Sequence, residues 1–353
     1  MRNGKVEKAL LRALGRDPES VNTDWFGTSL ISGALDHSRL GHPEAADFAA
    51  RWLESHIERH RGMAPDDLHE TCEGPRCRVI RGGALLIGTY CGYFGISHAC
   101  KKLFDQTGHA GARQACLDAG DVILHHAARN GLGLVCHDDG ERPFTIPDAA
   151  FFVIPPLLAA AAFDSPQAPA LGRQARVQLK GFADLFFDRG AMLTKTVFRD
   201  GRLGKTYWIR ATGWLLWAIA ESLGYLDRTE PIYGETVEKL AMMAEGLEKY
   251  QDVSGGFRLL VDDESAPLET TGSIMIACCV HKAVRCGWLP PKYARMAERA
   301  WEYVNSRTDG EGNLSGCYSG WALPAEDGEL QLFDRPMDWM QGMLLAAGAE
   351  FAT

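Results

Sequence analysis

The segment from Tyr207 to Ala220 holds residue types suited to sugar binding and reads Tyr-Trp-Ile-Arg-Ala-Thr-Gly-Trp-Leu-Leu-Trp-Ala-Ile-Ala. Trp208 and Trp214 offer flat faces that fit the apolar C–H side of a pyranose, and Arg210 between them offers a fork of N–H donors that fits a carboxylate. This spacing indicates a binding surface for a sugar that bears a carboxylate. The alternative is that both tryptophans pack the start of a helix and Arg210 forms a surface ion pair.

Asp148 is a candidate proton donor because apolar residues flank it, namely Phe144, Ile146, Phe151 and Phe152. Removal of water from a carboxyl disfavours its charged form and keeps a proton available near neutral pH. The alternative is that Asp148 caps the helix that begins after Pro147, where it would satisfy backbone N–H groups. Composition alone favours the cap.

The loop Cys136-His137-Asp138-Asp139-Gly140 precedes Asp148 and supplies an imidazole and two carboxylates. Loops at the mouth of a helical barrel commonly carry binding residues, so we select His137 as the functional residue here. A loop histidine with no partner is equally compatible with the sequence. Asp138 and Asp139 are expected to form part of an Asp-Asp-Gly turn.

The elements that would position these residues are predicted to be helices, since apolar residues recur at spacings of three and four between glycine-containing breaks. The predicted helices span 4–15, 24–40, 43–61, 81–94, 96–107, 110–130, 148–163, 168–188, 209–224, 231–250, 268–287, 290–307 and 337–351. Short strands are predicted only within 192–199 and 257–261, as hairpin arms at one end of the helical body.

Several helices form pairs in which an apolar, Gly/Ala-rich member precedes a more amphipathic one, as in 24–40 with 43–61 and 268–287 with 290–307. Apolar helices belong inside and amphipathic helices outside, so about six such pairs in a closed ring would give two concentric layers. We therefore predict an all-α (α/α)6 barrel formed by residues 1–353 as a single domain. An open helical solenoid is the alternative.

Composition excludes several classes of function. The 353 residues carry a net charge of −9, and no dense Lys/Arg cluster is present that could neutralise phosphates, which argues against nucleic acid as a partner. No eighteen-residue apolar segment and no signal peptide are found, so a cytoplasmic protein without membrane contact is expected. The ten cysteines form no C-x-x-C pair and are expected to be reduced, mainly buried thiols. We expect no metal and no cofactor, and the oligomeric state is open.

Three segments together resemble glycoside hydrolase families 88 and 105, the unsaturated glucuronyl and rhamnogalacturonyl hydrolases. They are Gln251-Asp252-Val253-Ser254-Gly255-Gly256-Phe257, Leu268-Glu269-Thr270-Thr271-Gly272-Ser273 and Gly287-Trp288-Leu289-Pro290-Pro291. Trp-Ile-Arg-Ala-Thr-Gly-Trp is also similar to the families' Trp-x-Arg-Gly-Asn-Gly-Trp. The resemblance extends from Asp24-Trp25 through Gly82-Gly83-Ala84-Leu85-Leu86 to Asp309-Gly310-Glu311-Gly312, which is nearly the whole chain.

The resemblance implies a reaction and a set of site residues. Family enzymes protonate the C4=C5 double bond of a terminal unsaturated uronate and add water at C5, and an aspartate that matches Asp148 is the general acid. Asp148 and His137 are thus the expected catalytic residues, and no cofactor is implied. The residues expected to bind an oligosaccharide or uronoside substrate are Trp25, Arg81, Lys195, Trp208, Arg210, Thr212 and Trp214.

The chain departs from the family pattern at three places. Arg78-Val79-Ile80-Arg81 stands where a second aspartate usually occurs, Lys195 stands roughly where a histidine occurs, and Thr212 replaces an asparagine. The two arginines suggest a substrate with more negative charge or a different uronoside.

Other functions remain open. Direct hydrolysis of a saturated β-glucuronoside would need a second carboxyl about 5 Å or about 6.5–9.5 Å from the first. The candidates for that second acid are Asp24, Asp252, Glu269 and Asp338. Sugar 2-epimerisation needs facing histidines, and the adjacent His125 and His126 would point about 100° apart on a helix. A barrel that only binds carbohydrate is the third alternative.

Overall fold

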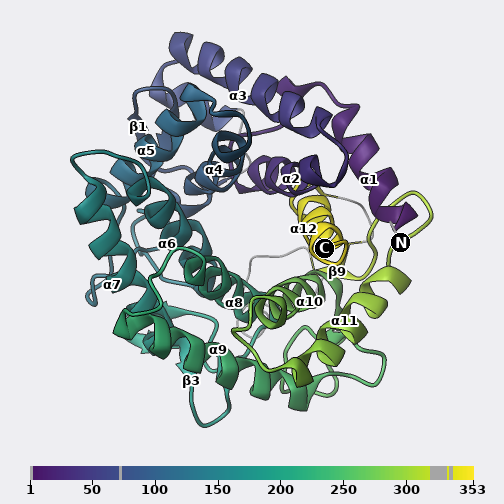
Figure 1. Cartoon of the computed structure of the whole chain (residues 1–353). Coiled ribbons are helices and arrows are strands. Elements are labelled where there is room, and N and C mark those ends of the chain that lie inside the picture. The colour runs from purple at the N-terminus through teal and green to yellow at the C-terminus, as the bar shows by residue number, and fades with distance from the viewer. Residues whose placement is uncertain (1–2, 71–73, 319–331, 334–336) are drawn as a thin grey trace.

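The computed structural model describes residues 3–70, 74–318, 332–333 and 337–353, and in this part of the chain twelve α-helices form two concentric rings (Figure 1). The inner ring consists of α2 (Trp25–Asp36), α4 (Ile96–Thr107), α6 (Pro147–Ala161), α8 (Ile209–Leu223), α10 (Thr270–Arg285) and α12 (Asp338–Glu350). The outer ring consists of α1 (Gly4–Leu14), α3 (Glu44–Gly62), α5 (Ala110–His125), α7 (Ala168–Phe186), α9 (Pro231–Tyr250) and α11 (Ala294–Ser306). The predicted (α/α)6 barrel is confirmed.

Burial explains which helices lie inside. In α8, every residue except Glu221 is buried, whereas α11 buries only one face. The ring closes where α12 packs against α2, and two glycines permit this contact. A Cβ atom on Gly33 would lie 2.2 Å from the carbonyl oxygen of Gly342, and one on Gly342 would lie 2.2 Å from that of Ser29. The two backbones can therefore meet only because both positions lack side chains.

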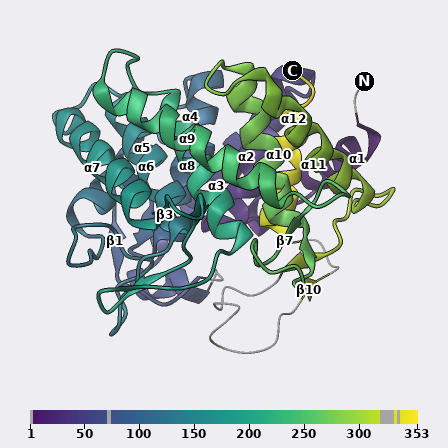
Figure 2. The same cartoon turned by 90° about the horizontal axis from the view of Figure 1, so that it is seen from below.

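Short antiparallel strand pairs lie at one end of the barrel, the end at which the inner helices begin (Figure 2). The pairs are β1 (Val79–Arg81) with β2 (Leu86–Gly88), β3 (Phe187–Asp188) with β4 (Leu193–Thr194), β5 (Phe198–Arg199) with β6 (Arg202–Leu203), β7 (Phe257–Arg258) with β8 (Leu268–Glu269), and β9 (Cys317–Tyr318) with β10 (Leu332–Phe333). Short 3₁₀ helices complete the connections at Pro18–Ser20, Ser38–Leu40, Pro65–Glu70, Cys91–Gly95 and Pro291–Tyr293. The strands predicted within 192–199 and 257–261 are confirmed as hairpin arms.

The predicted helix 81–94 is wrong, because this stretch contains β1 and β2 and the 3₁₀ helix at Cys91–Gly95. Asp118 on α5 accepts hydrogen bonds from the backbone N–H groups of Gly83 and Ala84, which a helix would direct elsewhere. A Cβ atom on Gly82 would lie 2.5 Å from the Asp118 carboxyl carbon. A tertiary contact, invisible in the local pattern, thus holds the chain extended. The other predicted helices match to within a few residues at each end.

No disulfide joins any of the nine cysteines in the described part of the chain, and seven of them are buried, so the prediction of reduced thiols is confirmed there. Cys72 lies outside the described residues. Among the helices of the described chain, none combines the length and the apolar character that a bilayer crossing requires.

Candidate active site

A cavity of about 350 Å³ opens where the inner helices begin. Its walls are mainly aromatic, and four titratable groups besides Tyr90 face it. The aromatic residues are Trp25, Phe26, Tyr90, Phe152, Trp208 and Trp339, and the other titratable residues are Cys91, His137, Asp148 and Arg210. Such a wall suits the apolar face of a sugar, and the few polar groups can fix its orientation.

Asp148 lies in the first turn of α6 and is placed there by Pro147, the first residue of that helix. Burial raises its pKa from the ordinary 3.8 to about 6, although the charges of Arg210 and His137 act in the opposite direction. Within the described residues, its Oδ2 atom is buried and has no hydrogen-bond partner. A capping aspartate would engage its oxygens with backbone N–H groups, and Oδ2 makes no such bond, so helix capping does not account for this oxygen.

Arg210 lies in the first turn of α8 and is enclosed by aromatic rings. Its guanidinium carbon is 4.3 Å from the ring centre of Trp208 and 5.0 Å from that of Trp339, and its Nη1 donates to the carbonyl oxygen of Tyr318 at 2.9 Å. Burial lowers its pKa, while Glu269 and Asp148 oppose the shift, so the side chain remains a cation. A buried, oriented guanidinium in the same cavity as Asp148 can bind a substrate carboxylate.

His137 is held from several sides. Its ring stacks on Phe144 at 4.7 Å between centres and lies 4.8 Å from the ring of Tyr90. Its Nδ1 is 2.7 Å from Oδ2 of Asp138, and its backbone carbonyl accepts from the N–H of Cys91 at 2.9 Å. The histidine is therefore a fixed part of the cavity wall. The alternative of a loop histidine with no partner does not hold.

Five of the residues predicted from the sequence share this cavity, namely Trp25, His137, Asp148, Trp208 and Arg210. The indole N–H of Trp208 is buried and, among the described residues, has no hydrogen-bond acceptor. A buried donor without an acceptor costs free energy unless a ligand or water binds it. Two residues that line the cavity thus each hold a buried polar atom that makes no hydrogen bond within the described chain, Trp208 and Asp148.

Three predicted substrate-binding residues, Arg81, Lys195 and Thr212, do not line this cavity. Arg81 donates to the backbone carbonyls of His60 and Met63 and braces α3. Lys195 lies 3.8 Å over the ring of Tyr207. Thr212 is buried within α8, where its hydroxyl donates to the carbonyl of Trp208 at 3.3 Å. Local spacing could not show these distances from the cavity.

Arg78 also points away from the cavity. It pairs with Asp139 at 2.7 Å and donates to the carbonyl of His126. Arg78 and Arg81 therefore add no charge to the pocket, and the expectation of a more anionic substrate, which rested on them, is withdrawn.

Trp214 is placed differently from Trp208. It lies beneath the cavity, where its ring is 5.1 Å from Phe152 and 6.1 Å from Trp25. A hydrogen bond from the indole of Trp214 to the Asp148 carboxyl lowers the pKa of Asp148, against the larger effect of burial. The structure thus places Trp214 as a support for the acid, outside the residues that line the sugar-sized space.

The lining residues that the sequence reasoning missed include Trp339 and Tyr90. Trp339 lies in the first turn of α12, as Trp25 lies in that of α2, and each directly follows an aspartate, so this repeated Asp-Trp pair was the available signal. Tyr90 fits because Gly92 lacks a side chain, since a Cβ atom there would lie 2.6 Å from Cε1 of the tyrosine. No pattern in the sequence indicated Tyr90.

The four candidates for a second acid have other roles in the described structure. Glu269 is fully buried and caps α10 by accepting from the N–H groups of Thr271 and Gly272, and it also accepts from that of Tyr318. Asp24 caps α2 through the N–H of Phe26, and Asp338 pairs with Arg16. Asp252 accepts from Ser254 in a turn and pairs with Arg258. Among the described residues, Asp148 is thus the carboxyl that lines the cavity.

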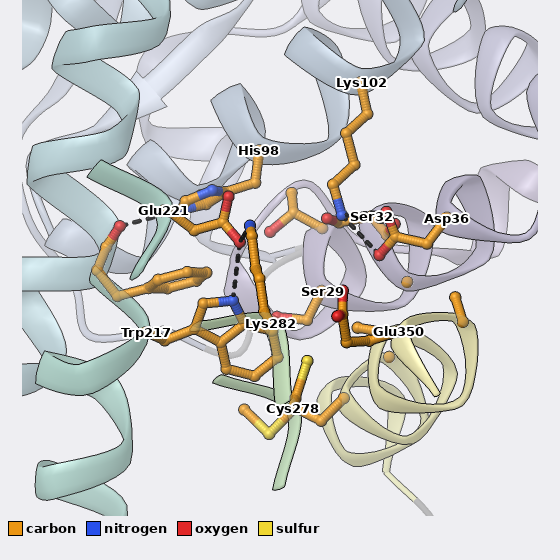
Figure 3. A pocket seen from close by; sticks show the side chains of 18 of the residues that line it. Ser29, Ser32, Asp36, His98, Lys102, Trp217, Glu221, Cys278, Lys282 and Glu350 are labelled. Carbon is orange, nitrogen blue, oxygen red and sulfur yellow. Dashed lines mark hydrogen bonds and ion pairs between the residues drawn. The ribbon is translucent and has the colours of Figure 1, made fainter. Parts of the chain in front are cut away.

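A second cavity of about 350 Å³ lies toward the other ends of the inner helices (Figure 3). Phe152 contributes to both cavities, so aromatic side chains form the partition. Six of its charged side chains form ion pairs, Lys102 with Asp36, Lys282 with Glu221 and Arg285 with Glu350, each at 2.7 Å. Burial would raise the pKa of Glu221, but Lys282 and Lys102 hold it at about 2. Glu221 is therefore a carboxylate near neutral pH, in contrast to Asp148 in the first cavity.

The sequence also matches a known protein family. The sequence model of Glycosyl Hydrolase Family 88 matches residues 38–353. The chain is 24% identical over 260 residues to YesR of Bacillus subtilis, an unsaturated rhamnogalacturonyl hydrolase. The aligned region covers 71% of this chain and 73% of that protein.

Two solved structures show the same fold. A possible member of the GH105 family from Klebsiella pneumoniae superposes with a TM-score of 0.80 at 16% identity, over 98% of this chain and 91% of that one. An unsaturated glucuronyl hydrolase from Bacillus sp. GL1 superposes with a TM-score of 0.70 at 16% identity, over 98% and 93% of the two chains.

Proposed function

The chain belongs to glycosyl hydrolase family 88 and is a glycoside hydrolase, and from this premise we propose that it removes a terminal unsaturated glucuronyl or galacturonyl residue from an oligosaccharide. The observation that carries the proposal is the Asp148 carboxyl, with its pKa raised to about 6, in one aromatic cavity with Arg210. The names of the relatives, a rhamnogalacturonyl and a glucuronyl hydrolase, support the same class of substrate.

The chemistry starts with binding of the substrate carboxylate. Arg210 pairs with the C6 carboxylate, and the indole faces of Trp25, Trp208 and Trp339 cover the ring. Asp148 then donates its proton to C4 as the C4=C5 double bond breaks, which leaves an oxocarbenium ion at C5. Water adds at C5 and its proton passes to His137, and the resulting hemiketal opens to release the rest of the oligosaccharide. Proton exchange with solvent restores both residues.

Direct hydrolysis at the anomeric carbon is the runner-up and is less well supported. That reaction needs two carboxyl groups on opposite sides of the scissile bond. In the described part of the chain, Asp148 is the carboxyl that lines the cavity, and the other acids proposed for the task cap helices or form ion pairs. Hydration of a vinyl ether needs a single acid, which fits this composition.

The test compares two substrates. An unsaturated disaccharide made by a polysaccharide lyase should lose its ultraviolet absorbance when the protein adds water to the conjugated double bond. A chromogenic saturated glucuronoside should remain intact. Release of the chromophore at a comparable rate would support direct hydrolysis and refute the proposal, and turnover of neither substrate would favour a binding protein.

The carboxylate role of Arg210 has its own test. Arg210→Lys keeps the charge but removes the forked donors, so it should raise KM for the unsaturated disaccharide by about tenfold or more. The same variant should bind the methyl ester of that disaccharide about as well as the wild-type protein does. An equal loss for acid and ester would show that Arg210 does not bind the carboxylate.

A further inference from the structure

Asp138 was expected to shape a turn, yet its carboxylate also contacts the candidate base. One oxygen, Oδ1, accepts from the N–H of Gly140 at 3.0 Å, as in a turn. The other oxygen, Oδ2, lies 2.7 Å from Nδ1 of His137. The His137 and Asp138 side chains are only 6% and 14% exposed, so water competes little with this contact.

The protonation of Asp138 decides which nitrogen of the histidine carries the proton. Burial would raise the pKa of Asp138, but the hydrogen bonds from His137 and Gly140 outweigh it and lower the pKa below its ordinary value. The group is therefore a carboxylate, which can only accept hydrogen bonds. Nδ1 of His137 must then carry hydrogen, and in the neutral imidazole the lone pair belongs to Nε2.

The rest of the environment prevents the ring from turning over. Phe144 and Tyr90 pack against the imidazole at 4.7 and 4.8 Å between ring centres. The backbone N–H of His137 donates to the carbonyl of Phe144 at 2.7 Å, which fixes the root of the side chain. His137 lines the cavity, and with Nδ1 directed at Asp138 the nitrogen that carries the lone pair of the neutral ring is Nε2.

We infer that Asp138 is a positioning residue for the hydration reaction, holding His137 in the tautomer whose Nε2 accepts a proton from the water that adds at C5. The inference rests on the proposed function. In the step, a water O–H bond breaks, its oxygen bonds to C5 and its proton goes to Nε2, while Asp148 delivers the proton to C4. Asp138 then faces an imidazolium and stabilises it through the same hydrogen bond.

The first experiment needs no substrate. In the ¹⁵N spectrum of the histidine side chains, His137 is assigned by its absence from a His137→Gln variant. The wild-type protein should show the proton on Nδ1 in the neutral form, and Asp138→Asn should shift the population toward the Nε2–H form because the amide can donate to Nδ1. A wild-type His137 with its proton on Nε2 would overturn the inference, whatever the activity of the protein.

The second experiment uses adjacent aspartates as a matched pair. Asp139 accepts from Arg78 and from Thr89, each at 2.7 Å, and so anchors the same loop through these two partners. Asp138→Asn should lower kcat on the unsaturated disaccharide by about 10- to 100-fold with KM changed less than about threefold. Asp139→Asn should change kcat by less than about threefold.

Equal losses in the two variants would show that loop order, and not the histidine tautomer, is what Asp138 supplies. Should Asp138→Asn fail to fold, Asp138→Glu serves instead, because it keeps an acceptor at a shifted position and should retain the Nδ1–H form with a smaller loss of kcat. Inactivity of the wild-type protein on the disaccharide would refute the proposed function alone, since the tautomer is measured separately.

Discussion

Replacement of Asp148 by Asn tests two consequences of burying a carboxyl in an aromatic cavity, namely a pH-dependent stability of the fold and a proton available for catalysis. The shift of its pKa from 3.8 to about 6 corresponds to about 3 kcal/mol of differential free energy between its two protonation states. A carboxyl whose pKa is higher in the folded than in the unfolded protein stabilises the fold at low pH. That stabilisation is lost as the pH rises from the unfolded value through about 6.

Asn cannot ionise, so Asp148→Asn does not suffer this loss. Relative to wild type, the free energy of unfolding of the variant should increase by about 1 to 2 kcal/mol between about pH 4.5 and about pH 8. The increase is smaller than the full value because about pH 4.5 already lies above the pKa of the unfolded state, and because the side chain borders the cavity. Urea unfolding at both pH values measures it. The same variant should lose about 10²- to 10⁴-fold in kcat, the usual contribution of a general acid.

Asp252→Asn provides a control in which the pH dependence of stability has the opposite sign. Hydrogen bonds from the backbone and side chain of Ser254 lower the pKa of Asp252, so its carboxylate stabilises the fold at neutral pH and this stabilisation is lost as the pH falls. Its replacement should lower stability at neutral pH and leave kcat unchanged. The reasoning about Asp148 is refuted if Asp148→Asn keeps kcat within about tenfold of wild type, or if its relative stability does not rise with pH.

Three further predictions concern the wild-type protein and the carboxylates of Glu269 and Glu221. In the wild type, kcat/KM should fall about tenfold per pH unit above about pH 6 as Asp148 loses its proton, and a kcat/KM that is flat to about pH 9 would contradict the acid role. Glu269→Gln removes one acceptor from a fully buried cap and should lower the free energy of unfolding by about 1–3 kcal/mol, where an unchanged urea midpoint would disprove the cap. Glu221→Gln leaves Lys282 without its carboxylate and should cost about 1–2 kcal/mol, a value reduced because the Glu221 side chain is 28% exposed. Activity should remain normal in Glu221→Gln if the second cavity takes no part in the reaction.

The sequence was sufficient to predict the two rings of helices because their apolar periodicity is a local property of each segment. It failed at residues 81–94, where hydrogen bonds from Gly83 and Ala84 to Asp118, more than thirty residues away, replace those of a helix. Periodicity measures which residues can be buried, and it contains no information about a partner from a distant helix.

The site divides in the same way. Asp148 could be identified from its apolar neighbours together with the resemblance to the families, and Arg210 from the tryptophans on either side of it. Both lie in the first turn of an inner helix, and the inner helices begin at the same end of the barrel. Lys195 was placed wrongly because it belongs to a hairpin, in which the side chain's direction depends on register and on Tyr207 as its partner. Trp339 was missed because it meets Trp25, at 5.2 Å between ring centres, although almost the whole chain separates the two residues in the sequence.

The amino-acid sequence by itself determined the helices, their inner or outer position and the apolar neighbours that desolvate Asp148, since all of these follow from residue type and spacing along one segment. Only the tertiary structure decided which side chains share a cavity, which charges neutralise one another at the far end of the barrel, and that Asp138 contacts the ring of His137. These features depend on distances between side chains and on ring orientation, which packing sets after the helices have closed into a ring.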